Sequence, residues 1–400
     1  MESFRYTLPA TDIVFGKGSL SCVGVEVKKL GRKALLVTGK ISMKKLGFLD
    51  KCIEFLEKEG IEVIHYGEVT PNPTVDIVNR GAQIAIDEGC DVTIGLGGGS
   101  AIDTAKNIAV VAGHFEGRET SISIWDFSLA NENPRSITSK TLPVVAITST
   151  SGTGSHVSRF AVVTNEQTRE KIGILSPFIC PKVSIVDSDI LSSMSPSLTS
   201  RTGFDVMAHL TECFVSRRSN PITDIYCLKG MELVLKYLPE AFNDGSNLEA
   251  RENMAIADTL AGWALVTSRP VLPHALSHPV SAFYPAVSHG EALAALTCES
   301  IRFNIENGGD ETVKKYCQIA QVAGKKINSF TRKEALKSVE VIEDLLEKIN
   351  LNITLKDLGV EEDKFEDMVK SVFSTMKGPI EANPVTLSRD DILNLYKKSM

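Results

Sequence analysis

The sequence predicts an α/β domain with a parallel sheet, followed by an all-helical domain. In the first half, short apolar β-branched runs alternate with segments of helical apolar spacing. After about residue 190 the strand signals stop and only helical periodicity continues. The chain has 400 residues, 43% hydrophobic and 23% charged, which suits two ordinary globular domains. We therefore expect domains at residues 1–188 and 189–400, with the boundary between Val186 and Ser195.

The first domain should alternate strands with helices. Strands are predicted at 33–38, 62–65, 91–96, 143–147 and 183–186, and helices at 45–59, 74–88 and 100–112. This alternation is typical of βαβ units and hence of a mainly parallel sheet. Two further runs, 159–164 and 171–175, are separated by a polar turn and predict a hairpin set on that sheet.

The second domain should contain only helices. Segments with helical spacing cover 199–217, 221–241, 248–267, 290–305, 311–325, 332–348, 363–375 and 389–399.

Charge and composition exclude several classes of function. The formal net charge of -7 disfavours nucleic-acid binding, which depends on clustered Lys and Arg. No apolar run approaches the roughly 18 residues needed to span a bilayer, and the amino terminus lacks the pattern of a secretory signal. The eight cysteines form no Cys-x-x-Cys pair, so we expect reduced thiols in a cytoplasmic protein.

A glycine-rich loop follows the third predicted strand. Residues 95–100 read Gly-Leu-Gly-Gly-Gly-Ser and precede a predicted helix. Glycines there let the backbone approach a phosphate, and the helix offers unpaired N–H groups. The alternative is a tight strand-to-helix turn, since glycine adopts positive φ at little cost. The loop does not match G-x-G-x-x-G, so a standard Rossmann fold is not expected, although a nucleotide pyrophosphate remains reasonable.

A second polar loop, 148–155, follows another predicted strand. Its eight consecutive small or hydroxyl residues could hydrogen-bond a nucleotide, or could form an ordinary solvent loop.

Carboxylate and imidazole groups cluster in the second domain. Asp205 and His209 stand at i and i+4 on one helical face, so both could reach one ion, although Asp205 could instead belong to a capping box begun by Thr202. His274 and His278 form a second i, i+4 pair. His289 follows eleven residues after His278. One carboxylate with two or three imidazoles would hold a divalent ion at a net charge of about +1. The spacing does not decide which histidines bind.

Taken together, these motifs resemble the iron-containing (group III) alcohol dehydrogenase family over essentially the whole chain. The residues that carry the resemblance are Phe15-Gly16-x-Gly18, Pro71-Asn72-Pro73-Thr74, the run from Gly97 to Lys106, the loop from Ser149 to Ser155, the run from Thr202 to His209, the segment with His274, His278 and His289, and Asn383-Pro384.

The resemblance implies a dehydroquinate synthase-like fold, in which a dinucleotide-binding domain precedes a helical metal-binding domain. It places the metal ligands on Asp205, His209, His274 and His289, and makes His278 a candidate catalytic proton relay. It places the cofactor on Gly39, Asn72, Gly98, Gly99, Ser100, Asp103, Ser149, Thr150, Thr153, Ser158 and Lys171.

The sequence departs from the family pattern at three places. His156 stands where the polar loop of the family usually ends in Glu, and His274 and His289 are one position further apart than in some relatives. Gly39 stands where many NAD-using relatives have an Asp that would bond the ribose 2′-OH. Because Gly39 removes a repulsive carboxylate and Lys40, Lys44 and Lys45 add positive charge, we expect NADP rather than NAD; the alternative is a simple turn beside solvated lysines.

The resemblance therefore predicts a metal-dependent, NAD(P)-linked alcohol dehydrogenase or aldehyde reductase that acts on small alcohols and aldehydes by hydride transfer. Fe²⁺ is the expected metal, with Zn²⁺ next, and a homodimer or higher homo-oligomer is the expected assembly. The alternatives are a polyol or hydroxyacid dehydrogenase, a dehydroquinate synthase-like lyase, and a catalytically silent metal-stabilised scaffold.

Overall fold

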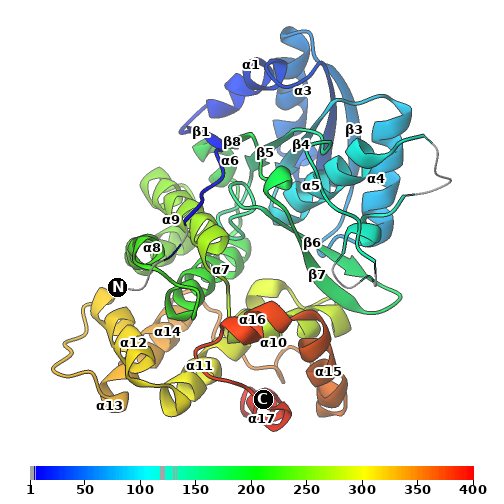
Figure 1. The fold of residues 1–400 in the computed structure, drawn as a ribbon. Helices are drawn as coiled ribbons and strands as arrows, with labels where there is room; N and C mark the ends of the chain where they lie inside the picture. Colours follow the sequence, from blue (N-terminus) through cyan, green and yellow to red (C-terminus); the bar gives the residue numbers. More distant parts are fainter. Residues whose placement is uncertain (1–3, 5, 118–121, 129–130, 132) are drawn as a thin grey trace. The chain divides into compact units, whose positions relative to one another are not determined.

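The computed structural model describes residue 4 and residues 6–117, 122–128, 131 and 133–400. Residues 9–194 form one compact unit, and residues 195–400 form the other together with the described residues among the first eight (Figure 1). This division lies a few residues after the boundary expected at 188. That the described residues among the first eight join the second unit was not predicted.

Among the described residues of the first unit, six strands form one sheet in which every neighbouring pair is parallel, which confirms the predicted, mainly parallel sheet. Its strands are β1 (Asp12–Phe15), β2 (Lys33–Gly39), β3 (Glu62–Val69), β4 (Val92–Gly97), β5 (Val144–Thr148) and β8 (Val183–Val186), in the spatial order β1-β8-β5-β4-β2-β3. The strand β1 was not predicted, because its four residues lie at the edge of the sheet and none of them is buried.

Helices cover both faces of this sheet, and strand β2 shows why. Ala34 and Leu36 contribute to the core that includes residues of α1 (Val23–Lys28) and α3 (Phe48–Lys58). Leu35 and Val37 contribute to the opposite core, which includes residues of α4 (Val75–Asp87) and α5 (Gly99–His114). A strand that is buried on both faces reads as a continuous apolar run, which is the pattern at residues 33–38. The remaining short elements of this unit are η1 (Ser19–Cys22), α2 (Ser42–Lys45), η2 (Ile124–Phe127), η3 (Pro177–Ile179) and α6 (Ser188–Leu191).

The strand order reverses between β2 and β4. From β2 the chain passes to the edge strand β3, then crosses back over β2 to β4 and continues to β5 on the other side. Ligands of open parallel sheets bind outside the carboxyl ends of the strands at such a reversal. Gly39 ends β2 and Gly97 ends β4, so two predicted cofactor segments begin at this point.

The predicted hairpin forms from β6 (Phe160–Asn165) and β7 (Glu170–Leu175), paired antiparallel. It is a separate two-stranded sheet that packs against α5, rather than an addition to the main sheet.

The second unit is helical, as predicted (Figure 1). Its helices are α7 (Pro196–Val215), α8 (Pro221–Asn243), α9 (Leu248–Thr267), α10 (Leu272–Phe283), α11 (His289–Asn307), α12 (Asp310–Val322), α13 (Arg332–Ala335), α14 (Lys337–Lys348), α15 (Phe365–Thr375), α16 (Lys377–Ala382) and α17 (Arg389–Lys398), with η4 (Glu362–Lys364) before α15. The predicted helix at 332–348 is divided into α13 and α14. No helix among the described residues has both the length and the apolar character required to cross a bilayer.

Helix α10 was missed, although it carries two of the candidate histidines. Pro273 lies in its first turn and Pro279 lies inside it. Proline inside a helical pattern is normally read as a break, so the local signal argued against a helix here. Burial on nearly all sides stabilises the helix, because nine of its twelve residues are buried.

Candidate functional site

Helix α7 holds Asp205 and His209 in its interior. The helix begins at Pro196, and the side chain of Ser195 caps it by accepting a hydrogen bond from the N–H of Leu198 at 3.2 Å. Thr202 therefore lies inside the helix, where its hydroxyl donates to the Leu198 carbonyl at 2.9 Å. The capping-box interpretation of Asp205 is wrong, because the helix starts several residues earlier.

Three elements bring the four predicted metal ligands together. His274 lies on α10 and His289 is the first residue of α11. From Oδ1 of Asp205, the distances are 3.4 Å to Nε2 of His274, 3.5 Å to Nδ1 of His209 and 3.8 Å to Nε2 of His289. Donor atoms of Asp205, His209 and His274 all lie within 4.8 Å of one another, and all three residues are buried. His289 lies at the longest of these distances and is more exposed, at 23% of its side chain.

The chemistry of these atoms fits a bound cation. Oδ1 of Asp205 and Nε2 of His274 are buried and make no hydrogen bond, although buried polar atoms are normally satisfied. Ligands about 2.1 Å from a tetrahedral ion are about 3.4 Å apart, and the Asp205 oxygen lies at that separation from the His274 and His209 nitrogens. The donor set of one carboxylate with imidazoles suits iron and zinc alike.

A fifth group, which the sequence analysis missed, lies on the other side of the His274 ring. The Glu212 carboxylate lies 2.6 Å from Nδ1 of His274. Burial opposes a charge on the His274 ring, but without a bound cation the charges and hydrogen bonds of Glu212 and Asp205 outweigh burial and raise the pKa of His274 to about 9. A cation bound at Nε2 would replace the proton there and leave the ring a neutral ligand. The signal was present in the sequence, because residues 205, 209 and 212 share one face of a helix.

His278 lies one turn after His274 on α10, and its ring is tilted relative to that of His274 and edge-on to that of His289. Its ring centroid is 6.5 Å from that of His274 and 5.4 Å from that of His289. The His278 ring therefore lies beside two of the candidate metal ligands. Because His278 is only partly buried, the ring is also accessible to solvent.

In the first unit, the glycine-rich loop has a packing reason for its glycines. A Cβ on Gly95 would lie 2.7 Å from Cα of Ile102, so only glycine lets α5 approach β4 this closely. A Cβ on Gly99 would meet the side chain of Thr153 at 2.6 Å, and one on Gly98 would meet Thr150 at 3.2 Å. The predicted glycine loop and the predicted hydroxyl loop are therefore in contact.

Together these loops present candidate phosphate-binding groups at the start of α5. Gly98 is the N-cap of α5 and provides no side-chain cap, and Gly99 and Ser100 are the first two helical residues. The first N–H groups of a helix have no partner within the helix and favour an anion.

The buried amine of Lys106 holds the hydroxyl loop in place. Lys106 is fully buried, and its Nζ donates to the carbonyls of Ser155, Ser158 and Phe160 at 2.7, 2.9 and 2.7 Å. Burial lowers the pKa of Lys106 to about 8, although the nearby carboxylate of Asp103 opposes this shift. The sequence analysis did not single out Lys106, although a lysine placed among the apolar residues of a predicted helix is unusual.

Asp103 and Ser158, both predicted to contact the cofactor, are engaged within the protein. The Asp103 carboxylate accepts hydrogen bonds from the Ser155 hydroxyl and from the N–H of Val162, the latter at 2.8 Å. Burial raises the pKa of Asp103, and Lys106 and these hydrogen bonds partly offset that effect. Ser158 is buried, and its carbonyl accepts from Lys106. Both residues are therefore placed to shape the loop.

The other predicted residues of the hydroxyl loop lie at the carboxyl end of β5. The N–H of Ser149 donates to the Gly97 carbonyl at 2.9 Å, and the Thr150 carbonyl accepts from Thr148 at 2.8 Å. The Thr153 hydroxyl accepts from the N–H of Ser155. His156, at the position of the family's Glu, is 1% exposed, and burial with the charge of Lys106 lowers its pKa to about 3. It is thus a neutral core residue.

Asn72 and Lys171 meet where the loop after β3 contacts the hairpin. Nζ of Lys171 donates to Oδ1 of Asn72 at 2.8 Å, and Asn72 adopts a left-handed conformation with φ of 54°. The N–H of Thr164 donates to the Pro73 carbonyl at 2.9 Å, which fixes the same loop to β6.

At Gly39 the structure provides no packing reason for glycine. A Cβ there would be 3.7 Å from the Val69 carbonyl, an ordinary contact, and the backbone is not left-handed. Lys40, Lys44 and Lys45 are exposed, and Lys40 lies 3.6 Å from the Glu68 carboxylate. Burial, with a smaller contribution from the charge of Lys44, lowers the pKa of His65 nearby.

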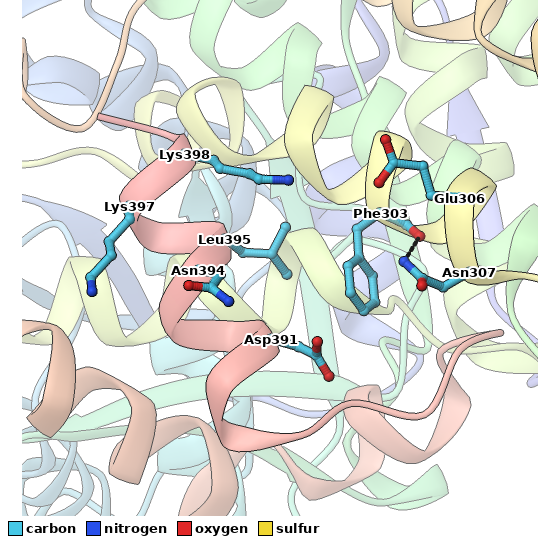
Figure 2. Close-up of a pocket in the computed structure, with 8 residues that line it drawn as sticks. All are labelled: Phe303, Glu306, Asn307, Asp391, Asn394, Leu395, Lys397 and Lys398. Atoms are coloured by element: carbon cyan, nitrogen blue, oxygen red, sulfur yellow. Dashed lines mark hydrogen bonds between the residues drawn. The ribbon is translucent and has the colours of Figure 1, made fainter.

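A separate surface pocket of about 370 Å³ lies between α11 and α17 in the second unit (Figure 2). Its lining combines carboxylates, amides and lysines, and includes none of the predicted site residues: Phe303, Glu306, Asn307, Asp391, Asn394, Leu395, Lys397 and Lys398. It is therefore not the candidate site.

Comparison with known proteins identifies the family of the chain. The model of the iron-containing alcohol dehydrogenase family matches residues 10–188, and the model of the C-terminal part of the Fe-containing alcohol dehydrogenase family matches residues 199–400. An archaeal halo-thermophilic alcohol dehydrogenase from a Red Sea brine pool has 47% sequence identity, a TM-score of 0.98 and full coverage of both chains.

Two curated relatives are similar over nearly their whole length. The choline dehydrogenase of Bacillus subtilis is 35% identical over 100% of this chain and 96% of its own. The NADPH-dependent butanol dehydrogenase of Clostridium saccharobutylicum is 33% identical over 98% of this chain and 97% of its own. These matches favour the predicted dehydrogenase over the lyase and scaffold alternatives. The chain therefore belongs to the iron-containing alcohol dehydrogenase family and is an oxidoreductase that acts on alcohols with a nicotinamide cofactor.

Proposed function

We propose that this protein interconverts small alcohols and aldehydes with NADP(H), using an iron ion held by Asp205, His209, His274 and His289. The observation that carries this proposal is the buried cluster of Asp205, His209 and His274, in which an Asp205 oxygen and a His274 nitrogen lack hydrogen-bond partners. A buried carboxylate with an unsatisfied oxygen is costly unless a cation completes it.

The metal ligands and His278 have different roles in this chemistry. When bound, iron would stabilise negative charge on the substrate oxygen and the nicotinamide would accept or supply hydride. Asp205 provides the only carboxylate oxygen among the proposed ligands, and the three imidazoles are neutral donors, so the ion keeps part of its charge. His278 is assigned the proton relay, because its ring lies 5.4 Å from that of His289 and is only partly buried.

The cofactor assignment rests on the reversal point of the sheet. Gly98, Gly99 and Ser100 at the start of α5 are assigned to the pyrophosphate. Asn72, Ser149, Thr150, Thr153 and Lys171 are assigned to the rest of the cofactor. Asp103 and Ser158 are assigned a supporting role, because their polar groups hold the hydroxyl loop.

The preference for NADP rests on Gly39. Because neither packing nor backbone conformation requires glycine there, the absence of a carboxylate is best explained by the ligand. The exposed lysines that follow favour a 2′-phosphate. A similar enzyme, the butanol dehydrogenase, is described as NADPH-dependent.

We further propose a homodimer or higher homo-oligomer, as the resemblance implies, in a reducing cytoplasmic compartment. All eight cysteines are free thiols and six of them are buried, which supports the compartment. Sedimentation of the purified protein tests the assembly.

The proposal is tested by anaerobic purification with metal analysis, followed by oxidation of NADPH and NADH with a panel of short aldehydes. We expect turnover that prefers NADPH, is lost with a chelator and is restored by Fe²⁺. Bound metal and bound nucleotide without turnover on any aldehyde would contradict the proposed substrate class, and equal rates with NADH would contradict the NADP preference.

A further inference from the structure

Glu212 contacts His274 and the start of α10 with both carboxylate oxygens. It lies on α7 seven residues after Asp205, and only 3% of its side chain is exposed. Oε1 is 2.6 Å from Nδ1 of His274. Oε2 accepts hydrogen bonds from the N–H of Val271 at 2.7 Å and from the N–H of His274 at 3.2 Å. One buried carboxylate thus fixes both the ring and the backbone of His274.

This contact determines which ring nitrogen of His274 is available as a ligand. An ionised carboxylate can only accept hydrogen bonds, so the nitrogen that faces it must carry a proton. A neutral imidazole with its proton on Nδ1 has its lone pair on Nε2. Nε2 of His274 is the nitrogen that lies 3.4 Å from Oδ1 of Asp205 without a hydrogen-bond partner.

We propose that Glu212 is a positioning residue that fixes the tautomer and orientation of His274, so that Nε2 is presented to the metal. The proposal rests on the metal site proposed above and adds a residue to it. Carboxylates behind ligating histidines set ring orientation and raise the basicity of the ligand.

Glu212 also changes the charge expected at this site. Asp205 with three neutral imidazoles would leave a divalent ion at about +1, as the sequence indicated. Counting the buried carboxylate of Glu212 brings the whole group to about zero. A neutral group is less costly to bury, so Glu212 favours retention of the ion.

A purely structural role for Glu212 is the competing interpretation. Val271, the N-cap of α10, provides no side-chain cap, and Glu212 fills that role from another helix. A test must therefore separate the loss of a cap from a change in the metal ligand.

Asp187 provides a matched control. It is 2% exposed, and its carboxylate accepts hydrogen bonds from the N–H groups of Gly18, Leu20 and Asp189 at 3.0, 2.8 and 2.9 Å. Like Glu212 it is a buried carboxylate that holds backbone amides, but it lies in the first unit and these three amides belong to that unit.

The experiment compares Zn²⁺ affinity of the metal-stripped full chain for wild type, Glu212→Gln and Asp187→Asn, by competition with a chromophoric chelator. The tautomer of His274 is read by ¹⁵N NMR of histidine-labelled protein, with His274→Ala used for assignment. In Glu212→Gln the amide N–H₂ can donate to Nδ1 and move the ring proton to Nε2. We expect Zn²⁺ to bind 10- to 100-fold more weakly, with a changed tautomer. Asp187→Asn should lose stability while keeping wild-type Zn²⁺ affinity.

Wild-type Zn²⁺ affinity and an unchanged His274 tautomer in Glu212→Gln would overturn the proposal. If Glu212→Gln does not fold, Glu212→Asp decides, because it keeps the charge but withdraws the carboxylate from His274; unchanged Zn²⁺ affinity there would also overturn it. Failure of the metal site itself gives a different result, since His274→Ala would then bind Zn²⁺ as well as wild type.

Discussion

Each unit of the molecule buries a polar centre, and the two centres differ in how they are satisfied. In the first unit, the Lys106 amine donates to three backbone carbonyls and both oxygens of Asp103 accept hydrogen bonds. In the second unit, an Asp205 oxygen and a His274 nitrogen have no hydrogen-bond partner. A centre that the chain satisfies by itself supports structure, whereas one that it leaves incomplete indicates a ligand.

The largest expected effect on activity comes from a substitution in the polar centre of the second unit, where Asp205 and His274 lack hydrogen-bond partners. His274→Ala should abolish metal retention and reduce turnover by about a thousandfold or more, because the ion loses a ligand and the substrate oxygen loses its stabilisation. Metal analysis per subunit and the aldehyde assay check this. His114→Gln, a change to a buried histidine of the first unit, should retain the metal. Full turnover of His274→Ala at normal metal content would rule out the assignment.

A substitution in the polar centre of the first unit, formed by Lys106 and Asp103, should mainly lower the free energy of unfolding. Lys106→Met leaves the carbonyls of Ser155, Ser158 and Phe160 without their donor and should lower the free energy of unfolding by about 3 kcal/mol. Nucleotide affinity should fall as well, because the hydroxyl loop is released. Urea unfolding and nucleotide titration measure the two effects. Lys28→Met removes an exposed ion pair with Glu59 and should cost less than about 1 kcal/mol; an equal loss in both variants would contradict the role of Lys106.

A third test uses His156, whose pKa is lowered to about 3 by burial and Lys106. Below pH 6.5 the unfolded chain binds a proton that the folded protein excludes. The stability from His156 is therefore complete above pH 6.5 and is lost as the pH falls toward 3, by about 1.4 kcal/mol per pH unit. His156→Gln should unfold with a smaller pH dependence between pH 6.5 and 4. Identical slopes for variant and wild type would show that His156 is protonated in the folded protein.

The smallest effect is expected at Gly39, at the end of strand β2, where packing and backbone conformation do not require glycine. Gly39→Asp should reduce selectivity for NADPH over NADH by about tenfold, because a carboxylate repels the 2′-phosphate. The ratio of kcat/KM for the two nucleotides measures it. The free energy of unfolding should not change, since the new Cβ meets only an ordinary contact at 3.7 Å. An unchanged selectivity for NADPH over NADH would contradict this role and favour the alternative, in which Gly39 simply forms a turn.

The sequence pattern predicted those strands and helices in which apolar residues recur with a regular spacing. The buried strand at 33–38 and the helix from Pro221 are examples, because the faces that are buried determine which positions are apolar. The pattern failed at α10, where two prolines argued against a helix that tertiary burial stabilises. It also failed at β1, whose four residues are held mainly by pairing with β8.

For the candidate site, the sequence alone determined the residue types, the helical spacing of Asp205 with His209, and the resemblance that selects the ligands. Only the tertiary structure decided which oxygens and nitrogens face one another, that Glu212 lies behind His274, and that Asp103 and Ser158 support a loop held by Lys106. The physical reason is that spacing along one helix or strand follows from local backbone geometry. Contacts between residues 62 or 49 positions apart depend instead on how separate elements pack.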